Sequence, residues 1–192
     1  MSGYHAVVLA AGAGARFGGG KLMAPFRGGA LVDRAVAAAL AAPVETVVVV
    51  TGADDRLAVH LSRRDRLVLV RAADHAEGMA ASLRAGLAAL PAGAAGALVF
   101  LGDMPDTPAA VPPRLIAALA GGAPAAVPVF EGRRGHPAGF SSALFPELLR
   151  LRGDRGARDL LAGLGDRLAE IETSEPGVMV DVDTPQDMAK LI

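Results

Sequence analysis

The sequence predicts an α/β fold with a mostly parallel sheet. Short apolar runs alternate with amphipathic or alanine-rich stretches, and the run at 45–51 is continuously apolar in its middle. A strand that is apolar throughout is typical of a parallel sheet covered on both faces, and the alternation implies right-handed crossovers. The length of 192 residues suits one domain over residues 1–192.

The expected elements follow one another along the chain. Apolar runs predict strands at 5–10, 45–51, 67–71, 97–101 and 125–130. Helices are expected between them, at 31–42, 54–62 and 78–90 and from Pro112-Pro113 onward. After about residue 140 we expect helices at 142–151 and 157–163, strands at 168–172 and 178–182, and a last helix from Thr184. Ligands bind at the carboxyl ends of parallel strands, so the loops after the first, third, fourth and fifth strands are the places to search.

Composition and charge exclude several classes of function. The chain carries 19 basic and 20 acidic residues, so we expect neither a nucleic-acid nor a membrane partner. It has no cysteine, which excludes disulfides, thiolate nucleophiles and cysteine-based metal sites. The first residues lack the basic stretch of a signal or transit peptide, and the apolar runs are too short to span a bilayer. We therefore expect a soluble, cytoplasmic protein.

A glycine-rich loop directly follows the first strand. Five of the nine residues at 12–20 are glycine, and Arg16 and Lys21 add positive charge. Glycines let the main chain approach a ligand closely, and main-chain N–H groups in such a loop form a nest for anions. A nucleoside triphosphate needs this neutralisation before an anionic nucleophile can approach it. The expected nucleotide contacts are Leu9, Ala10, Ala11, Gly12, Gly14, Arg16 and Lys21.

Other functions known for glycine-rich loops fit this sequence less well. It is not a Walker A loop, because it has no Gly-Lys-Ser/Thr triplet. A dinucleotide fingerprint starting at Gly12 would need a third glycine at Phe17, and no acidic residue ends the strand at 45–51, which disfavours a dehydrogenase. A plain strand-to-helix turn is the remaining alternative, and the two cations argue against it.

Two acidic clusters are candidate metal sites. Asp103 comes directly after the buried strand at 97–101, where a carboxylate is costly unless it meets solvent or a cation, and it is the first choice for Mg²⁺. The alternative is that Asp103 caps a turn, and Asp106 is expected to cap a helix. In the second cluster Asp181 and Asp183 would share one side of the strand at 178–182. We favour Asp183 as the second metal ligand; the alternative is that it caps the last helix.

Two further segments are expected near the site. The helix at 78–90 begins with Gly78 and carries Ser82 one turn in, where helix N-terminal amides can meet a base or phosphate; a plain cap with a packing serine is the alternative. The loop after the fifth strand contains Arg134 and His136, which suit an anionic second substrate, unless this is only a solvated basic turn.

Six motifs together resemble the MobA-like nucleotidyltransferase family, most closely its molybdenum cofactor cytidylyltransferase branch. They are LAAGAGARFGGGK at 9–21, AEGMAASLRAGL at 76–87, LGDMP at 101–105, GRRGHP at 132–137, GDRGAR at 153–158 and DVDTPQD at 181–187. The resemblance implies a Rossmann-like three-layer sandwich of the nucleotide-diphospho-sugar transferase type. It also implies that Lys21 and Arg16 meet the phosphates, that Asp103 binds Mg²⁺, and that the loop around His136 lies near the acceptor.

The resemblance further implies CTP rather than GTP as donor, because Ala11 stands where the GTP-using branch has glycine. The implied acceptor is molybdopterin or its metal-loaded form, and a molybdoenzyme or its chaperone is a candidate partner. The expected catalytic residues are Lys21, Arg16 and Asp103. Gly14-Ala15-Arg16-Phe17-Gly18 replaces the usual Ser-x-Arg-Met-Gly, which puts nucleotide affinity in question. The alternatives are transfer of GMP or CMP to another phosphorylated small molecule, and a non-catalytic carrier of the cofactor.

Overall fold

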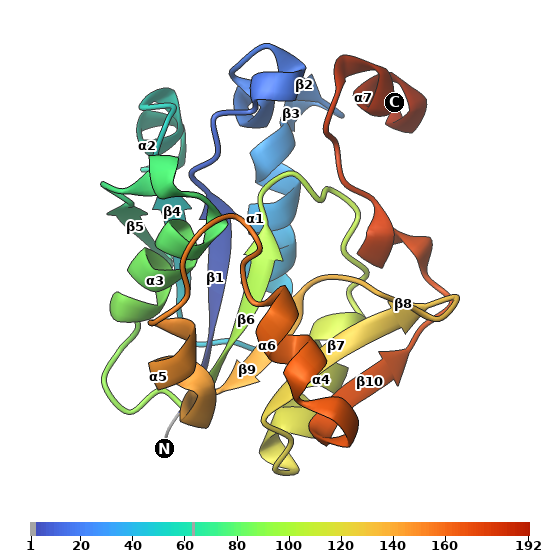
Figure 1. The fold of residues 1–192 in the computed structure, drawn as a ribbon. Coiled ribbons are helices and arrows are strands. Elements are labelled where there is room, and N and C mark those ends of the chain that lie inside the picture. The colour runs from blue at the N-terminus through green and yellow to red at the C-terminus, as the bar shows by residue number, and fades with distance from the viewer. Residues whose placement is uncertain (1–2, 63) are drawn as a thin grey trace.

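The computed structural model describes residues 3–62 and 64–192, so the first two residues of the N-terminal segment considered above lie outside it. Within these ranges an eight-stranded sheet has the order β10-β7-β9-β6-β1-β4-β5, with β8 paired to β7 (Figure 1). The strands are β1 (Tyr4–Ala10), β4 (Val47–Thr51), β5 (Leu67–Arg71), β6 (Gly96–Leu101), β7 (Ala125–Phe130), β8 (Arg133–Arg134), β9 (Ala138–Ser141) and β10 (Leu168–Glu172). A hairpin of β2 (Pro25–Phe26) and β3 (Gly29–Ala30) stands apart from the sheet.

The sheet is mostly parallel, as predicted. Strand β1 pairs in parallel with β4 and β6, β4 with β5, and β7 with β10. The short strand β9 enters antiparallel between β6 and β7, and the sequence did not predict it. Its four residues are Ala-Gly-Phe-Ser, too short and too weakly β-branched to be distinguished from a loop.

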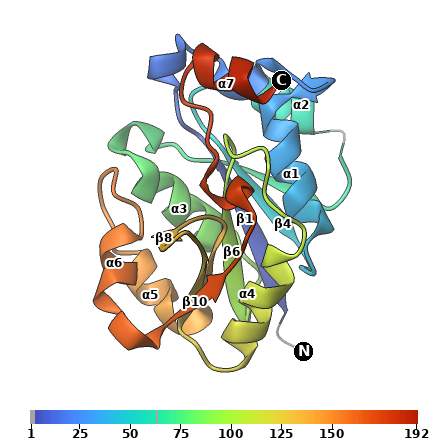
Figure 2. The ribbon, with the colours of Figure 1, turned by 90° about the vertical axis from the view of Figure 1, so that its right-hand side faces the viewer.

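Helices cover both faces of the sheet and make three layers (Figure 2). They are α1 (Leu31–Ala41), α2 (Arg56–Leu61), α3 (Met79–Ala88), α4 (Val111–Ala120), α5 (Phe145–Leu148), α6 (Arg158–Gly163) and α7 (Pro185–Leu191). The alternation of side chains along β1 separates two cores. Ala6 and Val8 pack in the core that contains residues of α1 and α4, whereas Val7 packs in the core of α3 and α5. No helix in the described ranges is long and apolar enough to cross a bilayer.

Two expected elements are wrong. The helix expected at 142–151 is a 3-10 turn, Ser142–Leu144, followed by the single turn of α5. The strand expected at 178–182 is a 3-10 helix, Pro176–Met179, followed by chain without regular structure. Val178 and Val182 are buried, which explains the apolar pattern, but their main-chain groups bond to loops: the Val178 carbonyl accepts from His136 N, and Val182 N donates to the Asp103 carbonyl.

Helix α3 approaches the sheet closely at Gly86. A Cβ at this position would lie 2.4 Å from Val7 Cγ1 and 2.9 Å from Val50 Cγ2. We expect Gly86→Ala to lower the free energy of unfolding by about 1–3 kcal/mol, because a well-packed core must shift to admit a methyl group. Gly163→Ala in α6 is the matched control, since its Cβ would meet no atom within 4 Å. Urea denaturation measures both, and equal stabilities would contradict the close packing.

The stability of the fold should depend on pH through His5. Its side chain is buried, and Nδ1 has no hydrogen-bond partner within the described residues. Burial lowers the pKa of His5 below its ordinary 6.5, although the charge of Glu45 opposes this. The unfolded chain therefore takes up a proton below pH 6.5 that the folded chain resists, so stability is full above this pH and decreases as pH falls through it.

We expect His5→Leu, which removes the titrating group at similar volume, to flatten the loss of stability between pH 7.5 and 5.5. Urea unfolding curves of both proteins at the two pH values measure this effect. Burial also lowers the pKa of His136, so part of the dependence should remain in the variant. An unchanged pH dependence would contradict the assignment to His5.

Candidate functional site

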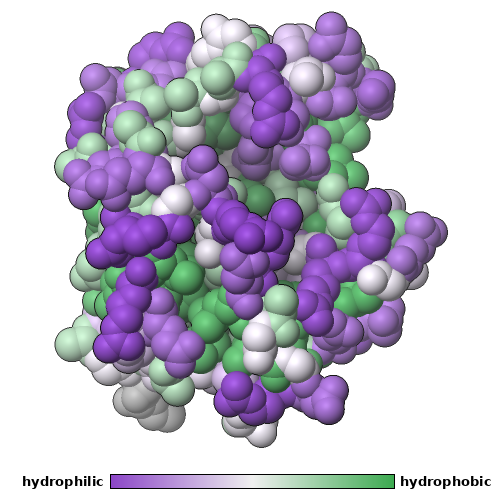
Figure 3. Space-filling model, viewed as in Figure 1, coloured by the Kyte–Doolittle hydropathy of each residue, from purple (hydrophilic) through white to green (hydrophobic). Residues whose placement is uncertain are grey.

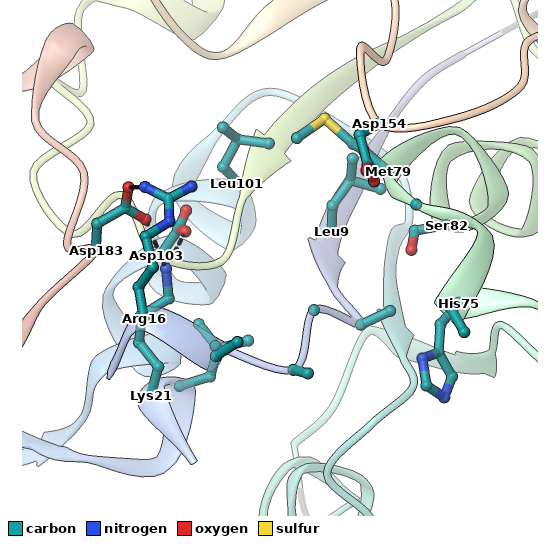
Figure 4. Close-up of a pocket in the computed structure, with 18 residues that line it drawn as sticks. Leu9, Arg16, Lys21, His75, Met79, Ser82, Leu101, Asp103, Asp154 and Asp183 are labelled. Carbon is teal, nitrogen blue, oxygen red and sulfur yellow. Dashed lines mark hydrogen bonds and ion pairs between the residues drawn. The ribbon is translucent and has the colours of Figure 1, made fainter. Parts of the chain in front are cut away.

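A pocket of about 660 Å³ opens at the carboxyl ends of the central strands. Leu9 and Leu101, at the ends of β1 and β6, lie on its floor, and the glycine-rich loop and the start of α3 form walls (Figure 4). On the face shown in Figure 3, hydrophilic side chains surround a recess in which apolar residues are visible. This is the edge of the sheet where the fold class predicts ligands.

The glycine-rich loop takes a conformation that depends on its glycines. Gly14, Gly18, Gly19 and Gly20 all have positive φ, between 61° and 93°, which other residues rarely adopt. The Gly14 carbonyl accepts hydrogen bonds from Phe17 N (2.9 Å) and Gly19 N (3.1 Å), and this bonding curls the loop. A Cβ on Gly14 would come within 2.9 Å of Lys21 Cβ, so the absence of a side chain there lets Lys21 fold back over the loop.

Lys21 connects its own loop to two distant segments of the chain. Its Nζ donates to Asp103 Oδ2 at 2.7 Å and to Asp183 Oδ1 at 3.3 Å. Arg16 Nη1 also pairs with Asp183 Oδ2. The Lys21 side chain is only 11% exposed, so its charge is held between the two carboxylates (Figure 4). The structure thus brings together Arg16, Lys21, Asp103 and Asp183, as the sequence predicts.

Main-chain contacts fix the positions of the two aspartates. Gly102 N donates to the Leu9 carbonyl at 2.9 Å, and a Cβ on Gly102 would lie 3.0 Å from that oxygen, so glycine permits this approach. Val182 N donates to the Asp103 carbonyl at 3.0 Å, which places the residue before Asp183 against Asp103. The two carboxylates therefore meet because their own backbones are bonded together.

The start of α7 fixes Asp183 from the other side. Thr184 is the N-cap: its hydroxyl accepts from Asp187 N at 3.2 Å, and Asp187 Oδ2 accepts from Thr184 N at 3.0 Å in a capping box. The hydrogen bond from Thr184 lowers the pKa of Asp187. The alternative that Asp183 caps this helix is therefore wrong, and its carboxylate is available to the pocket.

Asp181 lies near this cluster without contacting Lys21. Partial desolvation raises the pKa of its carboxyl, and the negative charges of Asp183 and then Asp103 raise it further. Asp181 and Asp183 do not alternate along a strand, because no strand forms there. Of the two, Asp183 is the one that lines the pocket and meets Lys21.

The wall of the pocket opposite Lys21 is mostly apolar and carries one hydroxyl group. Ser82 and Met79 of α3 line it with Gly78. Ser82 is buried, and Gly78 has φ +108°. Figure 4 shows Ser82 and Asp154 across the pocket from the Lys21 cluster.

Two further residues that the sequence did not single out line the pocket, Asp154 and His75. Asp154 lines the pocket because its loop packs on α3: Ala80 N donates to the Gly153 carbonyl at 3.0 Å, and a Cβ on Gly78 would lie 2.1 Å from Asp154 Oδ1. The motif at 153–158 carried this signal. His75, in the turn just before α3, also lines the pocket.

Two residues expected near the acceptor do not line this pocket. Arg134 lies on β8, is exposed, and its Nε donates to Glu170 Oε1 at 2.7 Å. His136 Nδ1 is buried and has no hydrogen-bond partner among the described residues. Burial lowers the pKa of His136, although the charge of Asp103 opposes this.

Asp106 does not cap a helix as expected. It accepts from Arg27 Nη1 at 2.6 Å and from Nη2 at 3.3 Å, and Arg27 belongs to the turn between β2 and β3. Helix α4 begins at Val111, with Ala110 at its N-cap. Asp106 therefore anchors the loop that carries Asp103.

The carboxylates Asp103 and Asp183 fit a hard divalent cation. Within residues 3–62 and 64–192 no group of three or more His, Cys, Asp or Glu side chains is placed to hold a metal. Mg²⁺ commonly takes only one or two carboxylates and completes its shell with phosphates and water. Asp103 and Asp183 both contact the Lys21 ammonium, so they lie close enough together to supply the two carboxylates that Mg²⁺ commonly takes.

Comparisons with known proteins agree with this geometry. Residues 6–171 match the MobA-like NTP transferase domain. The chain is 32% identical to nicotine blue oxidoreductase of Paenarthrobacter nicotinovorans, over 97% of this chain and 95% of the relative. It is 25% identical to molybdenum cofactor cytidylyltransferase of Escherichia coli, over 97% of this chain and 94% of the relative.

Solved structures show the same fold. Rv0371c of Mycobacterium tuberculosis, in complex with manganese, superposes with a TM-score of 0.81 at 26% identity and covers 99% of this chain and 97% of its own. A nucleotidyl transferase from Methanothermobacter thermautotroptrophicus has a TM-score of 0.84 at 26% identity, and the match covers 100% of this chain and 96% of that one. The fold is that of the nucleotide-diphospho-sugar transferases, and family and neighbours indicate a nucleotidyltransferase. The chain belongs to the MobA-like NTP transferase family.

Proposed function

We propose that this protein transfers CMP from CTP to the terminal phosphate of a molybdopterin-type acceptor and releases pyrophosphate, with Mg²⁺ as cofactor. The observation that carries the proposal is the contact of Lys21 Nζ with both Asp103 and Asp183 beside the glycine-rich loop. Cations in contact with a pair of carboxylates at the edge of a pocket are suited to bind a polyphosphate together with its metal ion.

The residues of the loop would neutralise and orient the triphosphate. Main-chain amides of the 12–21 loop, with Lys21 and Arg16, supply positive charge where charge grows in the transition state. An oxygen of the acceptor phosphate attacks the α-phosphorus, the bond from that phosphorus to the oxygen bridging to the β-phosphorus breaks, and pyrophosphate leaves. The attacking phosphate is already ionised, so no side chain needs to remove a proton.

Asp103 and Asp183 would hold the divalent cation, which when bound supplies charge neutralisation to the triphosphate. Both carboxylates are occupied in the free protein by Lys21 and Arg16. Binding of substrate therefore requires an exchange, in which the two cations leave the carboxylates for phosphate oxygens. Until the substrate binds, Lys21 and Arg16 neutralise the charges of Asp103 and Asp183.

One residue supports cytosine as the base. By its resemblance to the CTP-using branch of the family, Ala11 favours CTP as donor, and the relative named molybdenum cofactor cytidylyltransferase supports the same donor and acceptor. Another relative is named an oxidoreductase. The Lys21–Asp103 contact favours polyphosphate chemistry over hydride transfer, and the dinucleotide fingerprint fails at Phe17.

The direct test is pyrophosphate release with each of four nucleoside triphosphates, with and without molybdopterin, in the presence of Mg²⁺. We expect release with CTP only when the acceptor is present, and a loss of at least ~100-fold in turnover for Lys21→Ala with the fold retained, as for deletion of a preorganised catalytic donor. Lys190→Ala is the matched control, because Lys190 pairs with Asp187 outside the pocket.

Near-normal turnover of Lys21→Ala would refute the role assigned to Lys21, and no pyrophosphate release from CTP by the wild type would overturn the proposed reaction. Tight binding of the nucleotide-bearing cofactor without pyrophosphate release would instead indicate a carrier. Oxidation of a reduced nicotinamide dinucleotide, without nucleotidyl transfer, would indicate the oxidoreductase alternative.

A second prediction concerns the metal alone. We expect Lys21→Met to bind Mn²⁺ about tenfold more tightly than the wild type in the absence of nucleotide, because the variant removes a charged hydrogen-bond donor that competes for both carboxylates. Isothermal titration calorimetry measures this, with Lys190→Met as control. Unchanged or weaker Mn²⁺ binding by Lys21→Met would show that Asp103 and Asp183 are not the metal ligands.

A further inference from the structure

A second hollow, of about 310 Å³, adjoins the glycine-rich loop. It shares Gly12, Ala13, Lys21 and Leu22 with the main pocket, so the same loop lines both. Its remaining lining comes from Gly19 and Gly20 and from the segment after β4, which contributes Asp54 and Arg56 among others. The hollow is therefore lined by three glycines, two cations and one carboxylate, together with the apolar residues Ala13, Leu22, Ala53 and Leu57.

Arg56 is held in a fixed orientation by Asp54. Its Nε donates to Asp54 Oδ1 at 2.8 Å and its Nη2 to Oδ2 at 2.6 Å, a bidentate pair. The main-chain N of Arg56 also donates to Asp54 Oδ1, at 3.1 Å. The hydrogen bond from the Arg56 side chain holds the pKa of Asp54 below its ordinary range, so the carboxylate stays ionised and paired. The Arg56 side chain is 67% exposed, against 18% for Asp54.

The guanidinium of Arg56 packs on the loop directly before Lys21. A Cβ on Gly20, which has φ +63°, would lie 2.6 Å from Arg56 Nη2. Nη1 makes no hydrogen bond within the part of the chain that the structure describes, and it remains available to a ligand. Arg56 thus adds a third cation beside the nest, next to Lys21 and apart from Arg16.

An ordinary surface ion pair would not have these neighbours. Arg71 and Asp55 form such a pair at 2.6 Å, with side chains 64% and 77% exposed, and neither residue lines either of the two hollows described above. Isolated exposed pairs of this kind contribute little to stability. The difference at Arg56 is its position on a small cavity that it shares with Lys21 and the glycine amides.

We infer that the smaller hollow receives the pyrophosphate end of the triphosphate, the β- and γ-phosphates, and that Arg56 binds it there. This inference rests on the proposed function and adds to it the residue that holds the leaving group. Asp54 is a positioning residue, because within the described residues its side chain accepts hydrogen bonds only from Arg56 and fixes the plane of the guanidinium. A planar fork held in place suits phosphate oxygens better than a mobile ammonium.

The test uses Mg²⁺–tripolyphosphate and CMP as separate probes in isothermal titration calorimetry of the full chain. CMP lacks the β- and γ-phosphates, so it reports on the rest of the site. We expect Arg56→Ala to bind tripolyphosphate about tenfold more weakly, the low end for a charged hydrogen bond at an exposed site, and CMP as tightly as the wild type. Arg56→Lys should recover part of the loss, and Arg71→Ala should bind both probes normally.

Each other result contradicts the inference in a recognisable way. Unchanged tripolyphosphate binding by Arg56→Ala would overturn it and leave the proposed function standing. Equal losses for CMP and tripolyphosphate would assign Arg56 a structural role only. If the wild type binds neither CTP nor tripolyphosphate, the proposed function fails first, and this inference fails with it.

Discussion

The structure of the site depends on one ammonium group placed between two carboxylates. Asp103 and Asp183 come from segments eighty residues apart in the chain, and both accept from Lys21 Nζ, at 2.7 and 3.3 Å. Like charges so close would repel each other without a cation between them. In the free protein Lys21 and Arg16 supply that cation. When a metal-bound triphosphate binds, its metal can replace the cations at the two carboxylates, and its phosphates can accept hydrogen bonds from Lys21 and Arg16.

The rest of the fold holds the segments of Lys21, Asp103 and Asp183 at one edge of the sheet. Strands β1 and β6 are adjacent, so the loops after them start side by side. Arg27 connects the hairpin β2–β3 to Asp106 and, through Nε and Nη2, to the Leu191 carbonyl at the end of α7. Figures 1 and 2 both show α7 beside this hairpin, above the carboxyl ends of the strands. These hydrogen bonds of Arg27 connect the loop that carries Asp103 to the helix that follows Asp183.

Local chemistry explains which features the sequence could predict. The valine run of β4 is buried at every position, and the glycines of the loop adopt the positive φ that only they favour, so both were visible as patterns. The segment at 178–182 is apolar because two valines are buried against loops, and an apolar pattern alone cannot distinguish that from a strand. Asp154 and Arg56 reach the loop region through tertiary packing on Gly78 and Gly20, which no spacing along the chain reveals.

The most direct test of the exchange of partners is a crystal structure of the complex with CTP and Mn²⁺, with manganese located by anomalous scattering. The account predicts a manganese peak bonded to Asp103 and Asp183, and Lys21 Nζ on a phosphate oxygen instead of on Asp103. A peak elsewhere, or Lys21 still paired with Asp103 while CTP is bound, would contradict it.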